Sequence, residues 1–205
     1  MSCPVRSKFL SSMFVCVGLL AATVRAEPSN VTTLIAAAIE QTRHGVIYDG
    51  SYRRIGYPGG DVSADRGVCT DVIVRAYRAI GIDLQQRVHE DMVSNFSAYP
   101  KHWGMRAPDS NIDHRRVPNL QIFFRRQQGE LPVSANAFDY KPGDLVTWRL
   151  PGNLPHIGIV SDRVSVDATR FMIVHNIGRG PKLEDMLFDY PITGHYRFLR
   201  MNNSD

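Results

Sequence analysis

The sequence of residues 65–78 is Asp65-Arg66-Gly67-Val68-Cys69-Thr70-Asp71-Val72-Ile73-Val74-Arg75-Ala76-Tyr77-Arg78. Its apolar residues recur at helical spacing from Val72 onward, and Gly81 suits the end of a helix. Cys69 therefore begins a helix, where the positive end of the helix dipole lowers a thiol pKa and favours the nucleophilic thiolate. A buried, unreactive cysteine is the alternative interpretation, because free cysteines usually pack as small apolar side chains.

The N-terminus carries the pattern of an export signal. Arg6 and Lys8 precede an apolar run over residues 9–22, and Val24-Arg25-Ala26 offers a small-residue cleavage site. The run has 14 residues, fewer than the roughly 20 that a spanning helix needs, so export is favoured over a membrane anchor. We expect residues 1–26 to be a signal peptide and residues 27–205 one domain. The protein would then be periplasmic or secreted, without stable membrane insertion after cleavage.

Cleavage would change both the charge and the cysteine content. The chain has 24 Lys and Arg against 20 Asp and Glu, but three of the basic residues lie in the predicted signal peptide. The mature chain is then close to neutral, without the basic excess that nucleic-acid binding needs. Cys3 and Cys16 also leave, so Cys69 is the single cysteine of the mature domain. A single thiol in an exported protein indicates reactivity or intermolecular pairing.

Helices are predicted in the first half of the chain and strands in the second. Apolar residues at helical spacing predict four helices, over residues 30–44, 69–80, 83–96 and 119–128. Short β-branched and aromatic runs predict four strands, over residues 145–150, 156–161, 170–175 and 195–200. Because alternating βαβ units are missing, we expect an α+β fold with an antiparallel sheet and helices packed at one side.

Two histidines offer a base for the Cys69 thiol. A cysteine nucleophile needs a base that takes its proton and a third group that orients the base. His156 opens one apolar strand and His175 ends the next, so pairing of these strands as a hairpin would put the imidazoles side by side. Each histidine alone is more often a surface or hydrogen-bonded structural residue. Their positions at strand ends of one predicted sheet favour a shared catalytic role.

Residues 97–118 show no sustained period, and a loop of this length inside a compact domain is usually functional or disordered. It contains Asp113-His114-Arg115-Arg116, in which His114 is a rival base and the two arginines can bind substrate carboxylates. Asp113 and His114, with Asp71 beside the thiol, are grouped with them as substrate contacts. A solvated charge run is the alternative interpretation.

No cofactor is expected. A metal site can be drawn from four residues of the same loop, but their spacing matches no recognisable ligand pattern; they are His102, Asp109, Asp113 and His114. We therefore predict no metal. The chain also has neither a phosphate-binding P-loop nor a dinucleotide-binding fingerprint.

Several motifs resemble the NlpC-type cell-wall cysteine peptidases, a branch of the papain-like superfamily. Downstream of Cys69 stand Pro142-Gly143-Asp144-Leu145-Val146, Pro155-His156-Ile157-Gly158-Ile159-Val160 and Val174-His175-Asn176. The resemblance implies a papain-like fold with Cys69 as nucleophile, His156 as base and His175 as the orienting residue. Most of the chain is also similar to the exported bacterial YijF-like family, a domain of unknown function. That similarity is clearest in residues 65–71, 111–120, 156–162 and 175–178.

The surroundings of the cysteine depart from the peptidase pattern. Those peptidases usually have Asp-Cys-Ser-Gly, whereas this chain has Val68-Cys69-Thr70-Asp71. They commonly place a tyrosine shortly before a Gly-Gly turn as an oxyanion donor. Tyr57 before Gly59-Gly60 matches that position roughly, and Tyr52 is the second candidate, beside the backbone N–H of Cys69. The kept Cys-His-His set indicates the same chemistry on a different substrate.

We expect a monomeric exported hydrolase that cleaves amide bonds in peptidoglycan stem peptides. Cys69 attacks the carbonyl, His156 takes and returns the proton, and His175 orients His156. Arg115 and Arg116 hold the carboxylates of the stem peptide. Two alternatives stay open: an amidase, thioesterase or acyltransferase on the same scaffold, and a non-catalytic cell-wall binding module.

Overall fold

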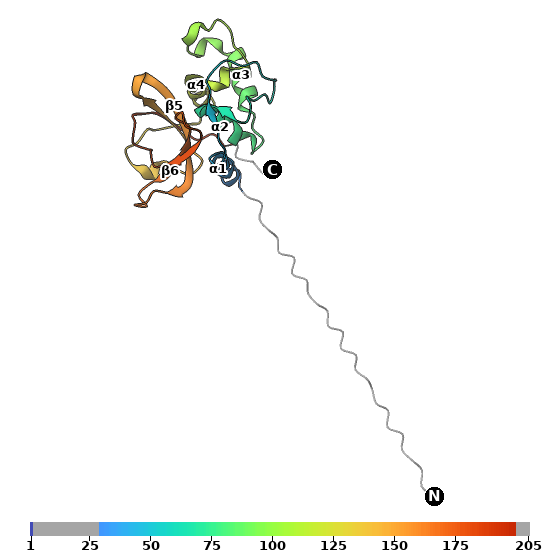
Figure 1. The fold of residues 1–205 in the computed structure, drawn as a ribbon, viewed down its shortest axis with the longest axis vertical. Coiled ribbons are helices and arrows are strands. Elements are labelled where there is room, and N and C mark those ends of the chain that lie inside the picture. Colours follow the sequence, from blue (N-terminus) through green and yellow to red (C-terminus); the bar gives the residue numbers. More distant parts are fainter. Residues whose placement is uncertain (2–28, 200–205) are drawn as a thin grey trace.

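The computed structural model describes Met1 and residues 29–199 (Figure 1). Apart from Met1, the predicted signal peptide lies outside the described residues. Four α-helices are present in the described part of the chain: α1 (Asn30–Gln41), α2 (Cys69–Arg78), α3 (Leu84–Ser94) and α4 (Val117–Arg126). All four predicted helices are thus confirmed; the first three are shorter than predicted, and the fourth has the predicted length but begins two residues earlier. Short 3-10 turns lie at Phe96–Ala98, His102–Gly104, Asp113–Arg115, Ala137–Asp139 and Pro151–Asn153.

A six-stranded antiparallel sheet forms the second half of the fold. Its strands lie in the order β3 (Glu130–Leu131), β8 (Ile192–Tyr196), β4 (Leu145–Leu150), β5 (Leu154–Val164), β6 (Phe171–His175) and β7 (Lys182–Glu184). Figure 1 shows the sheet at one side of the molecule and the helices at the other, which confirms the α+β prediction. The predicted strand over 195–200 is wrong in its bounds, because the ladder to β4 begins at Ile192.

A separate two-stranded parallel ladder precedes α2. It joins β1 (Ile47–Tyr48) to β2 (Arg66–Gly67), with Tyr48 opposite Gly67. The ladder therefore places a residue from the loop after α1 beside the start of α2. Its strands have only two residues each, too short to leave a periodic pattern in the sequence.

The start of α2 is fixed by a carboxylate rather than by the residue that caps it. Val68 occupies the cap position in an extended conformation, and its side chain has no oxygen that could accept a hydrogen bond. The carboxylate of Asp71 accepts the backbone N–H of Val68 at 2.7 Å instead. At the other end, Gly81 has φ +73°, a left-handed conformation that glycine adopts without strain. Cys69 is thereby held at the first turn of the helix.

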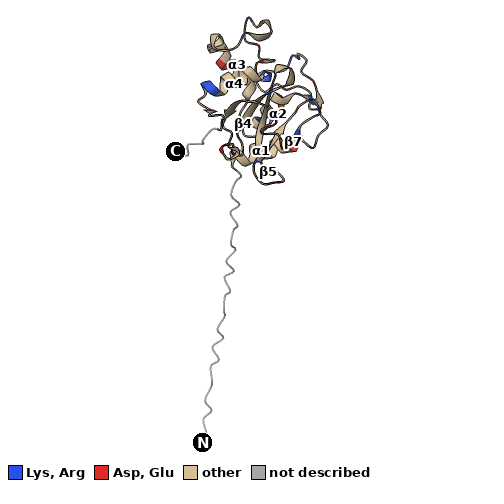
Figure 2. Ribbon diagram, turned by 90° about the vertical axis from the view of Figure 1, so that its left-hand side faces the viewer, with Lys and Arg blue, Asp and Glu red and all other residues tan. Residues whose placement is uncertain are grey.

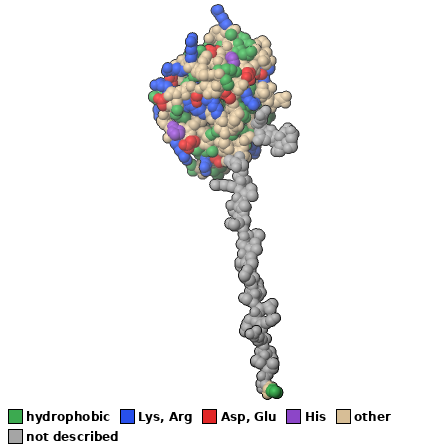
Figure 3. All heavy atoms as spheres, turned by 90° about the vertical axis from the view of Figure 1, so that its right-hand side faces the viewer, with side chains coloured by type: hydrophobic (Ala, Val, Ile, Leu, Met, Phe, Trp, Pro, Cys, Tyr) green, Lys and Arg blue, Asp and Glu red, His purple; other side chains and the backbone are tan. Residues whose placement is uncertain are grey.

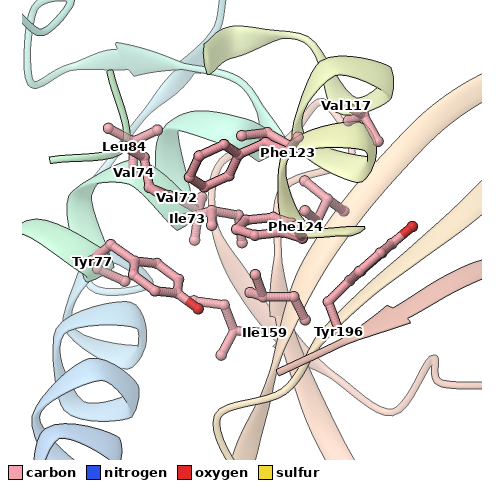
Figure 4. Packing of buried hydrophobic residues seen from close by; sticks show 14 of the residues in the cluster. Val72, Ile73, Val74, Tyr77, Leu84, Val117, Phe123, Phe124, Ile159 and Tyr196 are labelled. Carbon is pink, nitrogen blue, oxygen red and sulfur yellow. The ribbon is translucent and has the colours of Figure 1, made fainter. Parts of the chain in front are cut away.

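The main core lies between the helices and one face of the sheet (Figure 4). Side chains from α2 and α4, among them Ile73, Tyr77 and Phe124, meet Ile159 of β5 and Tyr196 of β8. A smaller cluster covers the opposite face; it is formed by Tyr140, Val146, Trp148, Val160, Ile173, Met186 and Leu187. Because α2 packs directly on β5, the start of α2 lies against the strand that carries His156.

The surface carries charges of both signs. Figure 2 shows basic and acidic residues distributed over helices and loops, and Figure 3 shows the two signs interspersed on the face that it displays. In residues 29–199 no helix is both long and apolar enough to cross a membrane.

Candidate active site

Cys69 is the first residue of α2, as the sequence predicts, but its thiol is closed off from solvent. The residue is 4% exposed and packs in the core between α2 and β5. Burial raises the pKa of Cys69 to about 12, although the backbone N–H of Ile157 acts in the opposite direction. The expected lowering of the thiol pKa is therefore wrong for this closed arrangement, because desolvation of the thiolate outweighs the helix dipole. The Ile157 N–H belongs to the peptide bond between His156 and Ile157, so the thiol lies against the backbone of β5 at this point.

His156 and His175 are joined by a hydrogen bond. β5 and β6 form the predicted hairpin, with Gly158 opposite His175. This register brings Nε2 of His156 to 3.1 Å from Nδ1 of His175, and the rings meet edge to face. Both imidazoles are buried. On its other side, Nε2 of His175 lies 2.9 Å from a carboxylate oxygen of Glu184.

The absence of a side chain at Gly158 permits this approach. A Cβ atom there would lie 2.6 Å from Cγ2 of Ile173, 3.0 Å from the carbonyl oxygen of Val174 and 3.1 Å from Cβ of His175. Contacts this short would push β6 away from β5. The glycine in the His156-Ile157-Gly158 sequence thus has a packing role in bringing the two histidines together.

Burial keeps both histidines neutral. It lowers the pKa of His156 to about 3, with a further contribution from the charge of His175. Burial also lowers the pKa of His175, while the carboxylate of Glu184 acts against it. The ring of His156 packs on Trp148 and uses Nε2 for His175. Its Nδ1 atom has no hydrogen bond to any residue that the structure describes.

The two predicted oxyanion donors have other partners. Tyr57 packs its ring on His89 of α3 at 5.2 Å, and the hydroxyl of Tyr52 accepts a hydrogen bond from Asn111. Neither contact involves the thiol, because the backbone of residues 55–60 is hydrogen-bonded to the start of α3 and to Asn111.

Tyr48 occupies the place beside the thiol instead. The β1–β2 ladder sets it opposite Gly67, two residues before Cys69. Burial, followed by the charges of Cys69 and Asp71, raises the pKa of Tyr48 to about 12. Tyr48 is 44% exposed, and its hydroxyl can donate a hydrogen bond.

Arg115 and Asp71 form a buried clamp rather than a substrate-binding surface. Nε and Nη2 of Arg115 each lie 2.9 Å from one carboxylate oxygen of Asp71. The same guanidinium donates to the carbonyl oxygens of Asp49 and Ser51. Every strong contact is internal, so the predicted substrate role of both residues is corrected. The clamp ties the chain after Tyr48 to the first turn of α2.

The rest of the 113–116 run is also largely internal. Asp113 is buried and bonds Nδ1 of His89 at 2.9 Å. His114 is buried as well, and burial lowers its pKa to about 3. These positions correct the prediction that Asp113 and His114 contact substrate, because their side chains face the core. Arg116 alone reaches toward the surface, with its guanidinium 4.7 Å from the ring centre of Trp103.

A cavity of about 480 Å³ opens beside His156. It is lined by His102, Trp103, Pro118, Gln121, Trp148, Arg149, Asn153, Pro155 and Thr193. Pro155 directly precedes His156, and Trp148 packs on the His156 ring, so the cavity adjoins His156. Cys69 is not part of the lining. The lining contains basic side chains and no acid. Arg149 is exposed and forms no ion pair among residues 29–199.

The described residues contain no group of three or more His, Cys, Asp and Glu side chains placed to hold a metal ion.

Residues 35–198 match the family described as a domain of unknown function (DUF1287). The chain belongs to this family. The uncharacterized protein YijF of Escherichia coli (strain K12) is 49% identical to it over 171 residues, which cover 83% of each chain. The predicted similarity to the YijF-like family is thus confirmed, and the resemblance to NlpC-type peptidases stays a prediction.

Two residues of this DUF1287 site were missed by reasoning from the sequence. Tyr48 stands 21 positions before Cys69 and reaches it only through the two-residue β1–β2 ladder. Glu184 lies on the three-residue β7, which pairs with β6 after a turn that contains Gly178 and Gly180 at positive φ. That glycine-bearing turn after a histidine-ended strand was the one available signal of a further hairpin.

Proposed function

We propose that this protein is an exported cysteine hydrolase of the papain-like type that cleaves amide bonds in peptidoglycan stem peptides. One observation carries the proposal: the thiol of a cysteine at a helix start lies beside the backbone N–H of Ile157, and the preceding residue, His156, is hydrogen-bonded at 3.1 Å to a second histidine. Helices on one face of an antiparallel sheet, with the cysteine on the helix that packs on the histidine-bearing strand, support the papain-like type.

In the proposed reaction, Nδ1 of His156 takes the thiol proton as the sulfur of Cys69 attacks the carbonyl carbon. Burial keeps the resting thiol and imidazole neutral, so the proton moves with the attack rather than before it. His156 then gives the proton to the leaving amine, and a thioester remains on Cys69. Water, deprotonated by His156, hydrolyses this thioester and restores the thiol.

The negative charge that develops on the carbonyl oxygen needs donors. The backbone N–H of Cys69 lies in the first turn of α2, where N–H groups have no partner within the helix. The hydroxyl of Tyr48 is the second donor in this proposal, because the β1–β2 ladder sets Tyr48 opposite Gly67, two residues before Cys69.

The cavity beside His156 supports an anionic substrate. Stem peptides carry carboxylates, and the lining of the cavity offers Arg149 and His102 without a competing acid. In this proposal Arg149 takes the role that the sequence assigned to Arg115.

The test is release of muropeptides from purified sacculi, followed by mass spectrometry. We expect release by the wild type and at least about 1,000-fold less by Cys69→Ala and His156→Ala. His44→Ala changes an exposed histidine at the end of α1 and serves as the matched control, with wild-type release expected. Equal release by the wild type and Cys69→Ala would remove the thiol from the mechanism. Product masses from amide and thioester substrates separate a peptidase from a thioesterase or acyltransferase.

A second function, a non-catalytic cell-wall binding module, is favoured by one observation: the thiol is buried and its pKa is raised to about 12. The pH dependence of iodoacetamide labelling distinguishes the two. A catalytic thiol reacts near pH 7 and slows when His156 is replaced by alanine. An inert thiol reacts only at high pH and at the same rate in both proteins.

A further inference from the structure

The contact between His175 and Glu184 has no part in the reaction as described above. β7 is the edge strand next to β6, with Ile173 opposite Glu184 and His175 opposite Lys182. From this diagonal position the carboxylate reaches back to Nε2 of His175 at 2.9 Å. The carboxylate is 47% exposed, whereas the imidazole that it contacts is buried. A polar chain thus runs from solvent through Glu184 and His175 to His156.

The protons in this chain can be placed by counting donors and acceptors. An ionised carboxylate only accepts hydrogen bonds, so Nε2 of His175 must carry a proton. The Nδ1 atom of neutral His175 then carries a lone pair, which accepts a hydrogen bond from the Nε2–H of His156. Because the proton of neutral His156 is on Nε2, its Nδ1 atom carries a lone pair. Both histidines are therefore Nε2–H tautomers.

The reverse arrangement is disfavoured by the same contact. If both rings were Nδ1–H tautomers, the lone pair of His175 Nε2 would face the carboxylate of Glu184 across 2.9 Å. In that state His156 would present an N–H to the thiol and could not take its proton. Without Glu184, nothing among the described side chains within hydrogen-bond distance of His175 Nε2 distinguishes the two arrangements.

We propose that Glu184 is a positioning residue that fixes both histidines as Nε2–H tautomers and so leaves Nδ1 of His156 free to act as the base. This inference rests on the proposed function. Glu184 touches neither the thiol nor the substrate and acts through His175. When His156 becomes an imidazolium, its Nε2–H still points at His175, and the carboxylate faces the new positive charge through that ring.

The other charged groups around His175 do not replace this role. Lys182 lies beside Glu184 on β7, with 3.9 Å between its Nζ and the carboxylate, and its charge lowers the pKa of His175. The charge of Asp189 raises the pKa of His175, as the charge of Glu184 does. Asp189 accepts no hydrogen bond from the His175 ring in the described structure. His156 is itself neutral. Glu184 is thus the one described acceptor on Nε2 of His175.

The first test reads the tautomers directly and needs no substrate. In protein labelled with ¹⁵N-histidine, we expect Nε2–H signals for both His156 and His175 at pH 7.5. Glu184→Ala should convert a substantial fraction of both rings to the Nδ1–H form, and Glu184→Gln, which keeps an acceptor oxygen, should restore part of the Nε2–H signal. Glu40→Ala removes a similarly exposed carboxylate on α1 and should change neither ring. Identical tautomers in the wild type and Glu184→Ala would overturn the proposal.

The second test measures hydrolysis. We expect Glu184→Ala to lower kcat by about 10- to 100-fold with KM unchanged, the range for carboxylates that orient a functional histidine. The Glu40→Ala control keeps the wild-type kcat. An active wild type with normal kcat in Glu184→Ala contradicts the role of Glu184 and leaves the hydrolase proposal intact. An inactive wild type whose tautomers still shift in Glu184→Ala contradicts the hydrolase proposal alone.

Discussion

One polar network holds the first turn of α2 and another joins β5, β6 and β7, and they differ in how completely their hydrogen bonds are used. On one side, Arg115 clamps Asp71 and binds two backbone carbonyl groups. On the other, His156 bonds His175, which bonds Glu184. The ion pair and both imidazoles are buried. The clamp, however, has a partner for each strong donor and acceptor, whereas the histidine chain ends at one free nitrogen.

This difference is not visible from residue type alone. The 113–116 run has more charge and a histidine, and by composition it resembles a binding site more than the strand around His156 does. Arg115 and its partner Asp71 nevertheless have only internal hydrogen bonds and nothing left to offer a substrate. His114 has a buried Nδ1 atom without a partner among the described residues, so a free nitrogen alone does not mark a base.

Breaking the clamp should give the largest loss of stability. Arg115→Met leaves the carboxylate of Asp71 buried without its partner, and we expect the free energy of unfolding to fall by about 3–5 kcal/mol. Urea denaturation at pH 7.5 measures it. Arg163→Met removes an exposed pair and should cost less than about 0.5 kcal/mol. Adding Asp71→Leu to Arg115→Met should recover part of the loss; a loss below about 1 kcal/mol in the single variant would contradict the clamp.

Acid should weaken the fold through its buried histidines. The pKa of His156 and of His114 is about 3 in the folded protein, against about 6.5 in an unfolded chain. Between these values the unfolded state binds more protons, so stability falls as the pH falls from 6.5 toward 3. Each histidine should cost about 2 kcal/mol between pH 6.5 and 5. Urea denaturation at the two pH values measures the change.

Replacing one of the two histidines supplies the control for that measurement. His114→Asn should reduce the pH-dependent loss by about one histidine's share, whatever its effect on stability at pH 7.5. Equal stability of the wild type at pH 6.5 and pH 5 would show that these rings are not held neutral.

Gly158→Ala should disturb the histidine chain itself. The new methyl group would collide with Ile173 and the Val174 carbonyl, and we expect a loss of about 1–3 kcal/mol with a weakened hydrogen bond between the histidines. Unfolding and the histidine ¹⁵N spectrum measure the two effects. Gly45→Ala is the matched control, because no atom lies within 4 Å of a Cβ at that position. Unchanged histidine signals in Gly158→Ala would contradict the packing argument.

Arg149→Met should have the smallest effect on stability and a selective one on function. The side chain is exposed and unpaired among residues 29–199, so unfolding should change by less than about 0.5 kcal/mol. KM for a carboxylate-bearing peptide should rise about 10-fold, with kcat unchanged and no rise for the amidated peptide. An equal rise in KM for both peptides would show that Arg149 does not bind the carboxylate.

The sequence predicts the elements whose patterns are local. Apolar spacing locates α2, and alternation locates β5 and β6, so the positions of Cys69, His156 and His175 follow. The pairing of Arg115 with Asp71 could not be predicted from the sequence. The two residues lie 44 positions apart and meet only when the loop packs on α2. Strands as short as β1 and β2 leave no periodic pattern in the sequence. The thiol pKa could not be predicted either, since it depends on burial by β5 and not on the helix alone.

The buried thiol at the start of α2 has a consequence for measured rates. A nucleophile that is 4% exposed meets a large substrate only in those molecules where the helix start and the β5 edge have moved apart. The apparent affinity for substrate is then the intrinsic affinity multiplied by the fraction of molecules in that open state. A partner or wall polymer that favours the open state would raise activity without touching a catalytic group. For the hydrolase proposed above, the resting protein would then resemble a zymogen more than a constantly active enzyme.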